Sequence, residues 1–255
     1  MFSPNKTLSR TTGFAMVAVQ VALLFYFWCS SSFVFLPTPG ETWDSLGKLW
    51  QDGLGTELIT SFQLNLQSIG VALLISLFLA YASVVPFFRP LVEFLSKLRF
   101  LSLAGLTFFF TMATSSGHEL KLYLLTYSIS VFFITSMADV LASIPKTQYD
   151  LARTLRMGEW RVVWEVIVLG QADKVFDVLR QNAAIGWMML TMIEGMSRSE
   201  GGVGAVLLNQ NKHFHLSSVM AIQLLILAVG LGQDYLIGVF KNIFCPYASI
   251  TLERK

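Results

Sequence analysis

The chain has 255 residues, of which 54% are hydrophobic and only 13% are charged. Soluble domains average about 25% charged residues, so this composition excludes an ordinary water-soluble domain. It also excludes disorder, which needs low hydrophobicity together with high net charge. The formal net charge of +2, without any Lys/Arg-rich run, argues against a nucleic-acid partner. The composition therefore indicates an integral membrane protein surrounded by lipid.

Charge-free intervals locate the expected membrane helices, because a central Asp, Lys or Arg costs about 2.5–3.5 kcal/mol on insertion. Each interval is close to the roughly 20 residues that cross the hydrocarbon core, except the short one at 181–193. That helix reaches span length if its flanking charged side chains extend to the interface. We expect one all-α polytopic domain over residues 1–255 with six transmembrane helices. The expected spans are 13–35, 60–84, 99–117, 121–138, 175–196 and 215–238.

The distribution of Lys and Arg orients these helices. With the N-terminus in the cytoplasm, 14 of the 18 Lys and Arg residues fall on the inner side and four on the outer side. Cytoplasmic loops are the ones enriched in positive charge. We therefore expect both termini inside and a long cytoplasmic loop over 139–174.

The outer segment 37–57 contains an expected short helix. Trp43, Leu46, Leu49 and Trp50 recur at spacings of three and four residues, as on one helical face. Tryptophan favours the membrane–water interface. We expect this helix to lie on the outer leaflet.

The inner loop 139–174 has an amphipathic pattern. Pro145 is suited to a helix start, and Leu151, Leu155 and Gly158 fall on one face of the helix that would follow. A helix lying on the membrane is one interpretation. The other is a short helix seated in a groove of a cytoplasmic partner, with anchors at helical spacing. A second helix is expected next, with an apolar stripe of Val162, Val163, Val166 and Ile167.

The segment 150–169 resembles the EAA loop of binding-protein-dependent ABC importer permeases. The family pattern is Glu-Ala-Ala, three residues, Gly, nine residues, Ile, one residue, Leu-Pro. Asp150 stands at the Glu position and Ala152 at the second Ala. Leu151 replaces the first Ala, Arg156 the usual Gly and Leu169 the usual Pro.

Two outer segments extend the resemblance over about residues 13–245. Leu36-Pro37-Thr38-Pro39 resembles the Leu-Pro-Ser-Pro segment of the nitrate/sulfonate/taurine/bicarbonate branch, and Gly201-Gly202-Val203-Gly204 resembles its Gly-Leu-Gly outer loop. The resemblance implies a type I ABC importer permease fold in a bacterial inner membrane. It also implies a second permease copy, two ATP-binding subunits, an extracytoplasmic solute-binding protein and a small anionic or polar solute.

The resemblance further implies that 147–161 forms a coupling helix on the ATPase, with Asp150, Arg153 and Trp160 as the closest contacts. This chain carries no P-loop motif Gly-x-x-x-x-Gly-Lys-Ser/Thr. We therefore expect a non-catalytic subunit without a cofactor of its own, with ATP and Mg on the partner. The expected coupling residues are Asp150, Leu151, Ala152, Arg153, Thr154, Leu155, Gly158, Glu159, Trp160 and Arg161.

Polar residues within the expected spans have two interpretations. They line a solute pathway, because polar groups at membrane depth face the bundle interior or water, or they form hydrogen bonds between helices. Glu194 and Arg198 are expected near the outer interface, where they would pair. The candidate pathway residues are Asn65, Thr111, Asn182, Trp187, Thr191 and Gln223.

Two other functional classes make different predictions. A secondary transporter or channel driven by an ion gradient needs Asp, Glu or His deep in its spans, and the span centres expected here are neutral. A membrane-embedded enzyme needs catalytic groups that converge at one depth. The sequence contains no such set, and we expect no catalytic or metal-binding residues.

Overall fold

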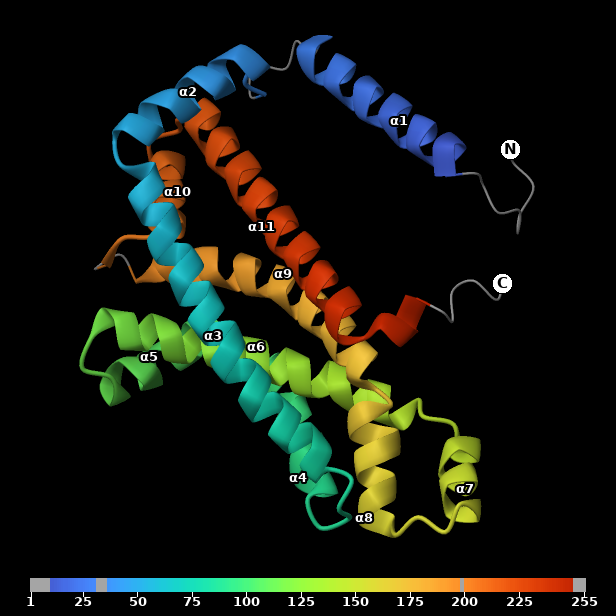
Figure 1. Cartoon of the computed structure of the whole chain (residues 1–255). Coiled ribbons are helices and arrows are strands. Elements are labelled where there is room, and N and C mark those ends of the chain that lie inside the picture. Colours follow the sequence, from blue (N-terminus) through green and yellow to red (C-terminus); the bar gives the residue numbers. More distant parts are fainter. Residues whose placement is uncertain (1–9, 31–35, 198–199, 250–255) are drawn as a thin grey trace.

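The structure is a computed structural model that describes residues 10–30, 36–197 and 200–249. Every regular element in these ranges is a helix, which confirms the all-α expectation for the described chain (Figure 1). Four helices are long and apolar enough to cross a membrane, so the protein is a multi-pass helical membrane protein. These four are α1 (Arg10–Ser30), α3 (Leu54–Ala82), α6 (Gly117–Ala142) and α11 (Leu216–Phe244).

The expected span over 99–117 has a different form. The helix there, α5 (Leu103–Ala113), has only 11 residues and is too short to cross a membrane by itself. It follows α4 (Arg89–Lys97) and the short helix η1 (Leu98–Phe100), which lie at 109° to it. Taken together, this bent pair counts as a fifth candidate span.

The expected span over 175–196 lies within one helix, α9 (Ala172–Met196). This helix has 25 residues but is not among the four apolar candidates. Its first three turns carry Asp173, Lys174, Asp177 and Arg180. Helix α9 can therefore cross the membrane as a sixth span only when these charged side chains have partners or reach the membrane surface.

Helix α2 (Pro39–Gln51) confirms that the segment 37–57 contains a short helix. The side chains of Thr38 and Glu41 cap its first turn reciprocally. Leu49 is buried against α11, while the exposed fractions of Trp43 and Trp50 are 74% and 55%. The Trp50 ring also packs against Gly55 of α3.

The core is built where α3, α6 and α9 cross. Leu125 and Leu190 are fully buried in its main cluster, and Ala80, Phe133 and Met137 form a second cluster nearer the end of α6. Helix α1 lies apart from this bundle, with Trp28 Nε1 donating a hydrogen bond to the Pro37 carbonyl at 2.9 Å (Figure 1). The remaining elements are α7 (Lys146–Thr154), α8 (Glu159–Val162), η2 (Val163–Leu169), α10 (Val203–Lys212) and η4 (Pro246–Ser249).

Cysteine labelling tests the orientation of α2. In intact spheroplasts, we expect Trp43→Cys and Trp50→Cys to react with a membrane-impermeant maleimide from outside, because both positions are exposed. Leu49→Cys should stay unreactive, because it is 6% exposed. Reaction of positions 43 and 50 only from the cytoplasmic side would overturn both the orientation and the interfacial position.

Candidate functional site

The inner loop between α6 and α9 contains two short helices rather than one. Helix α7 starts directly after Pro145, as expected, and ends at Thr154. Gly158 is extended and precedes α8, so the expectation of one helix over 147–161 is wrong. Helix α8 continues into a π-helical turn, η2, in which Ile167 is buried. The loop therefore consists of two short helices, α7 and α8, joined by a tight turn.

The turn between α7 and α8 is built around Arg156. Its amide donates to the Arg153 carbonyl at 2.9 Å, and the Met157 amide donates to the Ala152 carbonyl at 3.2 Å. This pair of bonds is a Schellman motif, which places its central residue in the left-handed region. Arg156 has φ of 57°, a conformation that favours glycine. Arg156 also occupies the position where the EAA pattern has Gly.

The surface of this loop is unusually apolar for an exposed segment. Leu151, Leu155 and Trp160 are 63%, 63% and 77% exposed, whereas Ala152 is buried. The Arg153 guanidinium and the Glu159 carboxylate form an ion pair at 3.2 Å that links α7 to α8. Exposed apolar groups gathered on one segment and bordered by charges are typical of a protein interaction site. The remaining expected coupling residues, Asp150, Thr154 and Arg161, are exposed as well.

Three polar side chains meet at the centre of the bundle. The Gln233 side-chain carbonyl accepts a hydrogen bond from Trp187 Nε1 at 2.7 Å and another from Asn65 Nδ2 at 3.2 Å. Asn65 is fully buried, and Asn182 is also buried, with its Nδ2 donating to the Val178 carbonyl. Asn65 thus has the hydrogen bond between helices that was the alternative to pathway lining, whereas the Asn182 bond lies within α9.

A groove of about 490 Å³ lies between α9 and α11. Three of the expected pathway residues, Trp187, Thr191 and Gln223, line it. Thr111 lies elsewhere, exposed on α5, where its hydroxyl donates to the Thr107 carbonyl. The other lining residues are Arg180, Ala183, Ala184, Met188, Ile226, Leu227, Gly230, Leu231 and Asp234.

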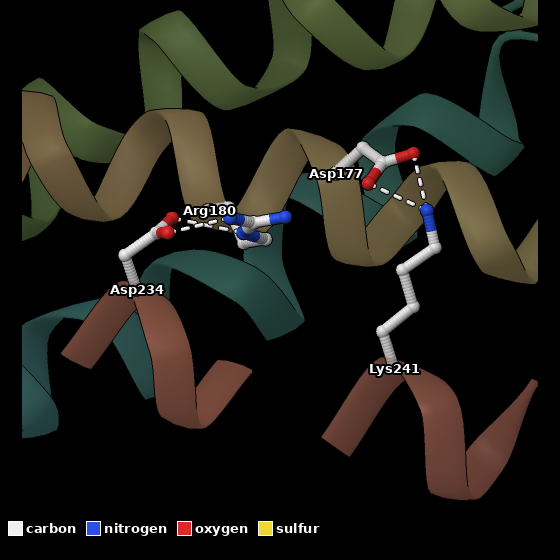
Figure 2. A network of polar contacts seen from close by, with 4 residues as sticks. All are labelled: Asp177, Arg180, Asp234 and Lys241. Atoms are coloured by element: carbon white, nitrogen blue, oxygen red, sulfur yellow. Dashed lines mark hydrogen bonds and ion pairs between the residues drawn. The ribbon is translucent and has the colours of Figure 1, made fainter. Parts of the chain in front are cut away.

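Two ion pairs join α9 to α11, and one of them, Arg180–Asp234, lines this groove (Figure 2). The Arg180 guanidinium donates twice to the Asp234 carboxylate, at 2.8 and 2.5 Å. The Lys241 ammonium donates to both oxygens of Asp177 at 2.6 Å. Such bidentate, charge-assisted bonds are stronger than neutral ones. They accommodate two of the four charges at the start of α9, Asp177 and Arg180, and the sequence pattern did not indicate these partners.

The opposite end of the bundle holds a cluster that we call the glycine clamp: Glu57, Ser61, Lys121, Glu194 and the segment 201–204. The Glu194 carboxylate accepts from the Ser61 hydroxyl at 2.6 Å and from the Gly204 amide at 2.8 Å. Ser61 accepts from the Val203 amide at 2.9 Å, and Glu57 accepts from the Gly202 amide. These acceptors satisfy the free amides at the start of α10.

Two charged residues of the glycine clamp are buried. Glu194 is only 1% exposed and is hydrogen-bonded to the Ser61 hydroxyl and the Gly204 amide. Its expected partner Arg198 lies outside the described residues. Lys121 is buried in the second turn of α6 and donates to the Gly201 carbonyl at 2.8 Å. The carboxylates of Glu57 and Glu194 and the ammonium group of Lys121 thus come from three different helices and all bind the segment 201–204.

Comparison with known proteins does not assign the chain to a family. No model of a known protein family matches the chain, and no curated protein matches it.

The turn at Arg156 makes a prediction about the inner loop. Arg156→Gly should slow amide hydrogen exchange over 146–162, because it removes about 1–2 kcal/mol of left-handed strain. Arg156→Val should speed exchange, because a β-branched residue is poorly accommodated there. Arg161→Gly, within α8, is the matched control and should also speed exchange. Faster exchange in Arg156→Gly would contradict the left-handed backbone conformation of residue 156 in this turn.

The glycine clamp makes a second prediction. A Cβ at Gly204 would collide with the backbone of Thr191. Gly204→Ala should therefore lower the temperature of thermal unfolding in detergent, at a cost of about 1–3 kcal/mol. Gly47→Ala is the matched control, because Gly47 lies within α2 and nothing lies within 4 Å of its added Cβ. Equal unfolding temperatures for the two variants would count against the close packing of α10 on α9.

Proposed function

We propose that this chain is the permease subunit of an ATP-driven ABC importer in a bacterial inner membrane. In this proposal the chain has the type I permease fold with six spans, and α4 with α5 and α9 supply the two crossings beyond the four apolar helices. Energy comes from two ATP-binding subunits, and an extracytoplasmic binding protein delivers a small anionic or polar solute. The proposed branch is the one for nitrate, sulfonate, taurine and bicarbonate.

The turn at Arg156 is the observation that carries the proposal. The resemblance places a Gly at this position, and the chain adopts a glycine-favouring φ there although its residue is Arg. A backbone conformation retained against the local preference of the residue supports a common loop geometry. The exposed Leu151, Leu155 and Trp160 on either side supply the apolar contacts that a groove on an ATPase would bury.

The groove between α9 and α11 supports a second permease copy. Side chains of the Arg180–Asp234 pair are 40% and 42% exposed at its inner end. Charged groups at membrane depth face protein or water rather than hydrocarbon, because exposure to lipid is costly. A second copy of the chain facing this groove would enclose a polar pathway lined by Trp187, Thr191 and Gln223.

One observation favours the alternative, transport driven by an ion gradient. The Arg180–Asp234 pair lies well inside α9 and α11, and paired charges of this kind occur in ion-coupled transporters. The two proposals differ in their energy source. Transport that stops when the ATPase is inactivated favours the importer, and transport that stops only when the ion gradient is collapsed favours the alternative.

Docking of the ATPase is the direct test. Leu155→Asp and Trp160→Ala should each abolish co-purification with the ATPase encoded beside this gene and uncouple ATP hydrolysis from transport. Both side chains are exposed, so their replacement should change stability by no more than about 0.5 kcal/mol. Asp150→Lys and Arg153→Glu should weaken the same complex, at a cost of about 2–5 kcal/mol where a buried charge pair is broken.

The control for docking is Lys212→Gln, at the opposite end of the molecule, which should leave the complex intact. The purified complex should contain two copies of this chain for two ATPases. Wild-type assembly and transport in all four loop variants would remove the coupling assignment. A helix lying on the membrane would then replace it.

A further inference from the structure

A second cavity, of about 600 Å³, opens where α4 meets the C-terminal turns of α6 and the start of the inner loop. It is separate from the groove between α9 and α11, with which it shares no lining residue. Its position beside Tyr149 of α7 places it at the predicted cytoplasmic end of the bundle. The remaining lining residues are Ser83, Val84, Pro86, Arg89, Val92, Glu93, Ser96, Lys97, Arg99, Thr135, Ala138, Asp139, Leu141, Ala142 and Ile167.

The charges of this cavity are unpaired. Arg89, Lys97 and Arg99 line it together with the carboxylates Glu93 and Asp139. Within the described ranges, none of these five residues takes part in an ion pair. The Arg99 guanidinium lies 5.1 Å from the centre of the Phe100 ring, a cation–π contact that leaves its charge uncompensated. The cavity thus carries an excess of positive charge and free guanidinium donors.

Helix α4 carries the charged residues on one side and exposed apolar residues on another. Arg89, Glu93 and Lys97 follow one another at four-residue spacing and share the side that lines the cavity. On another side, Leu91 and Phe94 are 49% and 60% exposed. Large apolar side chains that continue this exposed surface at both ends of the helix are Phe87, Phe88, Phe100 and Leu101. An amphipathic helix of this composition is suited to a membrane interface.

The depth of the cavity agrees with this arrangement. The Thr135 Oγ1 atom, which donates to the Val131 carbonyl at 2.9 Å, lies 3.5 Å from the Ser96 carbonyl, so the C-terminal part of α4 lies beside Thr135. Seven residues separate Thr135 from Ala142, where α6 ends, which corresponds to about 10 Å along the helix. With the end of α6 placed at the membrane surface, this distance matches the depth of an interfacial helix, whose apolar face reaches about 5–10 Å into the boundary between headgroups and acyl chains.

We propose that this cavity binds the headgroup of an anionic phospholipid of the inner leaflet. The phosphate accepts hydrogen bonds from Arg89, Lys97 and Arg99, while the acyl chains lie along Leu91 and Phe94. Basic pockets between helices on the cytoplasmic side recognise anionic headgroups by this combination of charge and apolar surface. Because Tyr149 lines the same cavity, the lipid would also contact α7 and tie the inner loop to the membrane surface. This proposal does not depend on the transport function.

The test measures lipid retention by the full chain. The purified, delipidated protein in detergent is exposed to equal amounts of phosphatidylglycerol and phosphatidylcholine, and bound lipids are counted by native mass spectrometry. We expect a preference for phosphatidylglycerol that falls about fivefold for each cation removed in Arg89→Gln and Lys97→Gln. Glu93→Gln should strengthen the preference, because it removes a carboxylate from the cavity; a misfolded variant would not show this gain. Lys146→Gln with Arg161→Gln is the matched control, on the same side but outside the cavity.

The outcomes separate binding of the lipid from binding of a free anion. Loss of the preference in the two cavity variants together with its gain in Glu93→Gln supports the proposal. Equal retention of the two lipids by the unmodified chain would overturn it, as would an equal loss in the control. Displacement of phosphatidylglycerol by inorganic phosphate at millimolar concentration would also overturn it, because the site would then recognise a free ion.

Discussion

The glycine clamp is the interaction on which the arrangement of α3, α6, α9 and α10 depends. Within a membrane protein, each amide and each charge removed from water needs a partner, since hydrocarbon supplies none. The first amides of α10 meet this requirement through Glu57, Ser61 and Glu194, which come from α3 and α9. Lys121 adds a bond from α6. The start of α10 therefore holds three long helices in a fixed relation to one another.

Polar groups become more accessible from the centre of the bundle towards the groove. At the centre, Gln233 accepts from both Asn65 and Trp187, and all three side chains are buried. This bond fixes the Trp187 ring where it forms part of the groove wall. At the groove's inner end, the Arg180–Asp234 pair is half exposed. Buried hydrogen bonds thus hold the helices together, while the Arg180–Asp234 pair remains accessible at the groove.

The end of the bundle that carries α4, α7 and α8 presents two apolar surfaces with different surroundings. The surface of α7 and α8 consists of Leu151, Leu155 and Trp160, bordered by the Arg153–Glu159 pair, and belongs to a loop. The surface of α4 belongs to a helix that packs along α6, with Val92 buried between them. Exposed apolar groups on a loop suit a protein partner, whereas those beside a transmembrane helix suit lipid. Tyr149 lies at the cavity where the two regions meet.

The sequence by itself determined the class of protein, because membrane insertion depends on the composition of each segment and not on its contacts. Local signals likewise placed the start of α7 after Pro145 and the short helix at Trp43. Only the tertiary structure decided the bend between α4 and α5, the burial of Lys121 and the partners of Glu194 and Arg180. Glu194 and Ser61 are 133 residues apart, and Arg180 and Asp234 are 54 apart. No periodicity within a segment reports such pairs, since the packing of helices distant in the chain brings the side chains together.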